Sequence, residues 1–94
     1  MEKAIALLEV RAMVTAIAAL DAMVKAADCK LIHVEKRLGG WLVTIVVEGT
    51  VSAVTAALDA GKAVAETVGK VVCAEVIARP HPDIMKFVKT DEGV

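Results

Sequence analysis

Two adjacent glycines between two strand-forming runs constrain this chain more than any other feature. Lys30–Arg37 and residues 41–47 both read as strands, and residues 38–40 (Leu-Gly-Gly) join them. Glycine tolerates the positive φ that a tight hairpin turn requires. A full positive charge, Arg37, and the only tryptophan, Trp41, flank this turn. A hydrophobic core needs neither of them at a loop tip, so we expect the tip to be the functional part of the chain.

The residues before the hairpin predict one strand and one helix. Residues 4–10 form a short apolar run interrupted by Glu9, which is typical of a strand buried on most of its surface. A helix is predicted to open at Arg11 and to end near Asp28 and Cys29. Its apolar stripe follows a three-four spacing: Met13, Ile17, Leu20, Val24 and Ala27.

The residues after the hairpin predict a second helix and a last strand. Glu48 and Gly49 read as a break, and Thr50 is the predicted N-cap of a helix over residues 51–68. Gly69 fits the position just after a helix end. The apolar positions of this helix are Val51, Val54, Leu58, Gly61, Ala65 and Val68. The β-branched run that follows, over residues 71–77, predicts a strand.

The predicted order is strand, helix, strand, strand, helix, strand, followed by a short helix that Asp83 caps. This order is the ferredoxin-like pattern of the α+β class, with four antiparallel strands and both helices on one face. We expect a single domain over residues 1–94. Its core spans about residues 4–81, and residues 82–94 form the C-terminal helix and a loose polar tail.

The composition predicts a subunit of a larger assembly. The chain is 57% hydrophobic but only 2% aromatic, and its net charge is −1. A 94-residue domain has a small interior, so this apolar surplus predicts surface that another subunit covers. The net charge of −1 does not resemble the basic surface of a nucleic-acid-binding protein. No run of apolar residues approaches the roughly 20 that a membrane-spanning helix needs. Two distant cysteines fit a reducing, cytoplasmic setting.

The residues offer no catalytic constellation, and we expect no enzyme and no cofactor. The chain lacks Asn, Gln and Tyr, and its one serine, Ser52, lies in the first turn of a predicted helix without a nucleophile elbow. RNA readers of this topology use aromatic residues on the central strands. Beyond Glu9 and the Trp41 beside the turn, these strands carry only aliphatic residues and Thr, so nucleic acid is not an expected partner.

The cysteines and histidines predict no metal site. Cys29 and His33 lie four residues apart and would share a face of one strand. Cys73 and His81 belong to the last strand and its exit, on the opposite edge of the sheet. A zinc site needs about four converging ligands. We therefore expect both cysteines to be small buried hydrophobes.

Five segments, in order and in one register from about Ala4 to His81, resemble bacterial microcompartment shell proteins. They are residues 6–11 (ALLEVR), 21–27 (DAMVKAA), 42–44 (LVT) with Gly49, 59–61 (DAG) with 68–69 (VG), and 76–81 (VIARPH). The resemblance implies a homo-hexamer that tiles a polyhedral shell in the bacterial cytoplasm. It also implies other shell proteins (hexamers, trimers and pentamers) and encapsulated enzymes as partners. The alternative is a small oligomeric module that binds metabolites, which would form a dimer or trimer without sheets.

The resemblance also assigns residues to two sites. It places Asp21, Lys25, Arg79, Pro80 and His81 at the edge between hexamers. It places Arg37, Leu38, Gly39, Gly40 and Trp41 around a central pore for small polar or anionic metabolites.

Three residues leave alternatives open. Lys25 also fits a solvated helix face beside Asp21, and Trp41 also fits a subunit seam. Arg37 has Glu35 or Glu48 as a possible partner. The tip is one residue longer than the family pattern and lacks its usual serine.

Two further departures from the family pattern lie outside the tip. Ala12 stands where the family often has glycine. Glu48 stands where arginine is common, which changes the charge of one face of the tile.

Overall fold

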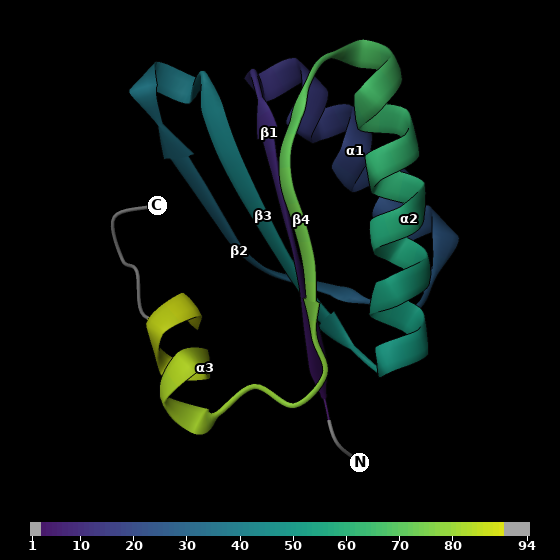
Figure 1. Cartoon of the computed structure of the whole chain (residues 1–94), viewed down its shortest axis with the longest axis vertical. Helices are drawn as coiled ribbons and strands as arrows, with labels where there is room; N and C mark the ends of the chain where they lie inside the picture. The colour runs from purple at the N-terminus through teal and green to yellow at the C-terminus, as the bar shows by residue number, and fades with distance from the viewer. Residues whose placement is uncertain (1–2, 90–94) are drawn as a thin grey trace.

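The computed structural model describes residues 3–89 and confirms the predicted order of elements (Figure 1). The strands are β1 (Ala4–Arg11), β2 (Lys30–Arg37), β3 (Leu42–Gly49) and β4 (Val71–Ile77). The helices are α1 (Met13–Ala26), α2 (Val51–Val68) and α3 (Pro82–Lys89), and a 3-10 turn (Leu38–Gly40) joins β2 to β3. The predicted polar tail, residues 90–94, lies outside the described residues.

The four strands form one antiparallel sheet in the order β2-β3-β1-β4. The prediction that the second and fourth strands are opposite edges is therefore confirmed. At one end of the sheet, Leu42 pairs with both Arg37 and Arg11. At the other end, Glu48 pairs with both Lys30 and Ile5. The turn and the start of β1 thus lie at opposite ends of the sheet.

The strands differ from the prediction at their boundaries. β1 continues through Arg11, which was expected to open the first helix. β3 begins at Leu42, one residue after Trp41, and the break predicted at Glu48 and Gly49 is wrong. Ladder pairing outweighs the low strand propensity of these two residues, because Glu48 pairs with both β1 and β2 and Gly49 pairs with Ala4 of β1.

Close packing of small residues joins α1 and α2 on one face of the sheet (Figure 1). Ala19 and Met23 of α1 and Gly61 and Ala65 of α2 are buried in one core cluster with the sheet. A Cβ added at Gly61 would lie 2.5 Å from Cγ of Met23, so only glycine fits without movement. Thr50 caps α2, because its hydroxyl accepts a hydrogen bond from the backbone of Ala53 at 3.1 Å.

The buried face of α1 differs from the predicted stripe. The residues buried in α1 are Thr15, Ala16, Ala19 and Met23. Ile17 is 61% exposed and Val24 is 45% exposed, although both were predicted to be buried. The stripe predicted for α2 is confirmed except at its ends, where Val51 and Val68 are exposed. Ala16, Ala19 and Met23 of α1 lie in the core, whereas the larger aliphatic side chains of Val14, Ile17 and Val24 are exposed.

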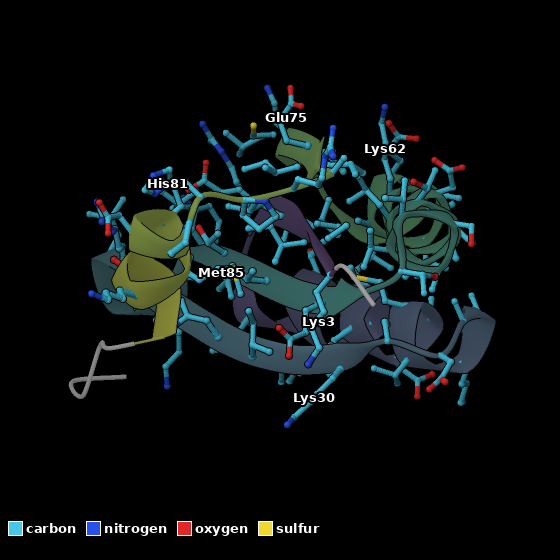
Figure 2. All side chains as sticks on the ribbon, turned by 90° about the horizontal axis from the view of Figure 1, so that it is seen from below. Lys3, Lys30, Lys62, Glu75, His81 and Met85 are labelled. Atoms are coloured by element: carbon cyan, nitrogen blue, oxygen red, sulfur yellow. The ribbon has the colours of Figure 1, made fainter. Side chains whose placement is uncertain are left out.

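The third helix, α3, lies on the opposite face of the sheet from α1 and α2 (Figures 1 and 2). Its residues Met85 and Val88 pack against Ile5 and Val46, which point away from the main core. The prediction that both helices of the β-α-β-β-α-β unit lie on one face is confirmed for α1 and α2, and the short last helix lies on the other face. Among residues 3–89, no helix is long and apolar enough to span a membrane.

Candidate functional site

The hairpin tip is built from three consecutive residues with positive φ. The values are 56° at Leu38, 67° at Gly39 and 89° at Gly40. No atom lies within 4 Å of a Cβ added at either glycine, so the backbone conformation and not the available space requires glycine there. The amide of Trp41 closes the turn by donating to the carbonyl of Leu38 at 3.2 Å. The prediction of a glycine-dependent turn is confirmed.

A backbone hydrogen bond holds the tip against the end of β1, because the amide of Ala12 donates to the carbonyl of Trp41 at 2.7 Å. The amide of Arg11 donates to the carbonyl of Lys70 at 3.0 Å, which ties the same end of β1 to the residue before β4. Ala12 has a φ of 72° and a ψ of 141°, a conformation that favours glycine. Glycine would adopt this conformation with less strain than alanine does.

The charge of Arg37 is compensated within its own strand. Nε and Nη2 of Arg37 each lie 2.7 Å from Oε2 of Glu35. Nε2 of His33 lies 3.5 Å from the other carboxylate oxygen, Oε1. Hydrogen bonds from Arg37 and then from His33 hold the pKa of Glu35 below its ordinary value. Glu48, the alternative partner for Arg37, lies at the other end of the sheet and pairs with Lys3 at 3.3 Å.

Two large apolar side chains are exposed at the tip. Leu38 is 75% exposed and Trp41 is 57% exposed in the single chain. Neither contributes to the core clusters on the two faces of the sheet. The tip therefore presents a cation, apolar side chains and backbone amides together.

The five residues that the resemblance assigns to an edge fall on two different elements. Asp21 and Lys25 form an ion pair of 2.9 Å on the exposed side of α1. Arg79, Pro80 and His81 follow β4 and lead into α3.

His81, and not Asp83, stands at the start of α3. Its carbonyl accepts a hydrogen bond from the amide of Ile84 at 2.9 Å. Its Nδ1 accepts from the amide of Asp83 at 3.1 Å. The prediction that Asp83 caps α3 is wrong, because the helix begins at Pro82 and Asp83 lies inside its first turn.

The tip and the five edge residues lie apart in the structure. The α1 helix starts beside the tip at Met13 and runs away from it, so Asp21 lies about 12 Å and Lys25 about 18 Å further along at about 1.5 Å per residue. Arg79 follows Ile77, which pairs with Ile5, and the tip adjoins Arg11 at the other end of β1. These ends are also separated by roughly 20 Å at about 3.3 Å per residue. Figure 2 looks onto the end remote from the tip, where Lys3 and Lys30 lie.

The cysteines do not behave as predicted. Cys73 is exposed on the edge strand β4 and Cys29 is half-buried, so the expectation of two buried cysteines is wrong. Burial and then the charge of Asp28 raise the pKa of the Cys29 thiol. Cys29 packs toward the helices, whereas His33 pairs with Val46 on the other face, because β2 carries a register shift between them. Among residues 3–89, no group of three or more His, Cys, Asp or Glu side chains converges to hold a metal.

Sequence reasoning missed a set of polar side chains on the half of the sheet that no helix covers. The hydroxyl of Thr44 donates to Oε2 of Glu9 at 3.0 Å, and Thr44 also pairs with Glu35 across β2 and β3. One step nearer the tip, Leu42 lies between Arg37 and Arg11. The signal was the alternation of polar residues at every second position of these strands.

Comparison with known proteins gives consistent matches. The BMC domain matches residues 4–80. The shell protein PduA of Citrobacter freundii is 46% identical over 93% of this chain and 92% of the relative. EutM of Escherichia coli K12 is 49% identical over 87% of this chain and 84% of the relative. The carboxysome shell protein CsoS1A of Hydrogenovibrio crunogenus is 45% identical over 86% of this chain and 84% of the relative.

A solved structure supports the same assignment. A microcompartments protein from Desulfitobacterium hafniense DCB superposes on 100% of this chain with a TM-score of 0.83 and 26% identity. This chain spans 51% of the length of that protein. The fold class and the resemblance are therefore confirmed, and the chain belongs to the BMC-domain family of bacterial microcompartment shell proteins.

Proposed function

We propose that this chain forms cyclic hexamers that tile into the facets of a microcompartment shell in the bacterial cytoplasm. Residues 37–41 line the central pore, and the edge residues on α1 and after β4 contact neighbouring hexamers. The observation that carries this proposal is the separation of roughly 12–20 Å, along α1 and β1, between the two sets of residues. A disc needs its hub and its rim at opposite ends of each subunit.

Two different apolar surfaces support a ring. On the β2 side of the chain, Ile17 of α1 is exposed and lines a cavity of about 50 Å³ together with Val34 of β2. Val14 of α1 is also exposed. On the β4 side, Val68 of α2 and Val72 of β4 are exposed. Contact between two unlike surfaces is head-to-tail, and it closes into a ring when the rotation between subunits allows. Such contacts would also cover the aliphatic side chains of α1 that the single chain leaves exposed.

Rotation about the hub repeats the tip in every subunit. The backbone amides of Gly39 and Gly40 and the side chain of Arg37 then form rings around the pore. Rings of donors and charges select among small solutes by charge and polarity. We propose that small polar or anionic metabolites pass to enzymes enclosed by these hexamers and other shell proteins.

Sedimentation velocity tests the ring. We expect a hexamer for the wild type and smaller species for Ile17→Asp, because a carboxylate would be buried at the subunit contact. Ala63→Asp is the matched control, since Ala63 is exposed on α2 and should leave the hexamer intact. A wild-type monomer at working concentration would refute the assembly, and a dimer or trimer would favour a metabolite-binding module.

Electron microscopy tests the edge assignment. We expect Lys25→Ala and Arg79→Ala to keep hexamers but lose extended sheets, because both side chains would contact the next hexamer. Lys62→Ala removes an exposed lysine of α2 and serves as the control. Normal sheets from both edge variants would contradict the assignment.

A further inference from the structure

We propose that Glu35 determines the charge selectivity of the pore by compensating Arg37, so that each subunit presents an ion pair and not a free cation. The inference rests on the proposed hexamer and pore. It assigns a role to a residue that stands outside the tip itself. The carboxylate of Glu35 would thus set how strongly the pore prefers anions.

The first support is the geometry of the pair. Glu35 and Arg37 are two residues apart on the same face of β2, and both are paired with β3, at Thr44 and Leu42. Arg37 has the extended backbone of a strand, with a φ of −130° and a ψ of 160°. The sheet therefore fixes the distance between the two Cα atoms. The guanidinium places two nitrogens on one carboxylate oxygen, both at 2.7 Å, which is a strong charge-assisted contact.

The second support is the environment of the other carboxylate oxygen. Oε1 of Glu35 faces Nε2 of His33 at 3.5 Å, and the His33 side chain is only 10% exposed. His33 pairs with Val46, which belongs to the small core under α3. The imidazole is therefore held in place, and it orients the carboxylate toward Arg37. Glu35 is ionised at neutral pH, as an exposed carboxyl group ordinarily is, and its contacts with Arg37 and then His33 lower its pKa further.

The third support is the balance of charge on the tip-side half of the sheet face that carries α3. Arg37 and Arg11 flank Leu42 in the row nearest the tip. Glu35 and Glu9 flank Thr44 in the next row. Each guanidinium thus follows a carboxylate on its own strand. The positive and negative charges on this half of the sheet are therefore equal in number beside the proposed pore.

Repetition of the ion pair around the axis of the proposed ring determines the net charge at the pore. An exposed ion pair in one chain contributes little to stability. In a ring, however, uncompensated Arg37 side chains would all repel one another and attract anions from solution. Removing the carboxylate of Glu35 adds one positive charge per subunit at the pore. Removing the guanidinium of Arg37 leaves one negative charge instead.

Quenching of a fluorescent cargo inside reassembled shells tests the inference. Stopped-flow mixing with iodide, caesium or acrylamide gives the entry rates of a small anion, a cation and a neutral molecule. We expect Glu35→Gln to raise the iodide rate relative to acrylamide by about tenfold at low ionic strength, with the gain reduced by salt. Arg37→Gln should shift the preference toward caesium. The double variant should restore the wild-type ratios, because both charges are gone.

Controls separate this inference from the proposed assembly. Glu66→Gln makes the same chemical change on the exposed side of α2 and should leave every ratio unchanged. Sedimentation velocity confirms the hexamer for each variant. Unchanged ratios in Glu35→Gln, while Arg37→Gln alters them, would overturn the role of Glu35 and leave the pore intact. Hexamers in which no tip variant alters any rate would overturn the pore itself.

Discussion

Ala12 stands in a conformation that costs free energy, and replacing it with glycine should stabilise the protein. Its φ of 72° and ψ of 141° lie in a region that residues with a Cβ rarely adopt. The backbone cannot relax easily, because the amide of Ala12 donates to Trp41 at 2.7 Å and its carbonyl accepts from Ala16 at 3.2 Å. Both bonds use backbone atoms, so glycine would keep them. The substitution would remove the strain and little else.

The expected gain is about 1 kcal/mol. Strain in such a region costs about 1–3 kcal/mol. Against this, glycine loses about 0.5–1 kcal/mol more conformational entropy than alanine on folding. Ala12 is half-buried, so its lost methyl group subtracts only a few tenths of a kcal/mol. The net gain corresponds to about a fivefold increase in the ratio of folded to unfolded protein.

Urea unfolding followed by circular dichroism, at one fixed protein concentration, measures this gain. We expect the midpoint of Ala12→Gly to rise by about 0.5 M. Ala63→Gly, at an exposed position inside α2, is the control and should lower stability by about 1 kcal/mol. If Ala12→Gly destabilises the protein as much as the control does, the backbone conformation of Ala12 costs no measurable free energy and the reasoning is refuted.

Three further predictions follow from single contacts. Gly61→Ala should cost about 1–3 kcal/mol, because the new methyl group meets Met23; urea unfolding should show a smaller cost in a Met23→Ala background. Arg37→Ala should raise the pKa of Glu35 toward its ordinary value of 4.5, which a carboxyl NMR titration measures. The contact stabilises the fold above that value, and this stability is lost as the pH falls through the lowered pKa of Glu35. Thr50→Ala should cost about 1 kcal/mol in thermal or urea unfolding, because α2 loses its cap; an unchanged stability would contradict the role of that bond.

Ile17 and Val24 link the fold to the proposed assembly. Their spacing predicts a buried helix face, yet the single chain leaves them exposed. The apolar pattern of α1 is therefore better explained by contact with both α2 and a neighbouring subunit than by contact with α2 alone. Ala19 and Met23 of α1 pack in the core with α2, and we propose that Ile17 and Val24 pack on the next subunit. A pattern based on hydrophobicity alone cannot distinguish burial inside a chain from burial between chains.

The sequence by itself determined the order of the elements and the character of the tip. Glycine pairs, helix caps and β-branched runs act within a few residues, so Thr50, Gly39 and Gly40 could be assigned from local chemistry. The family motifs added the candidate pore and edge residues. These features depend on backbone conformations that the neighbouring residues already restrict.

Only the tertiary structure decided which surfaces meet. It placed α3 on the face opposite α1 and α2, exposed Cys73, and carried β3 through Glu48. It also chose Glu35 over Glu48 as the partner of Arg37, because strand register brings the first beside the tip and the second to the far end. Register and packing depend on contacts between residues distant in the chain. Local propensities do not encode these contacts, so they emerge only when the strands pair.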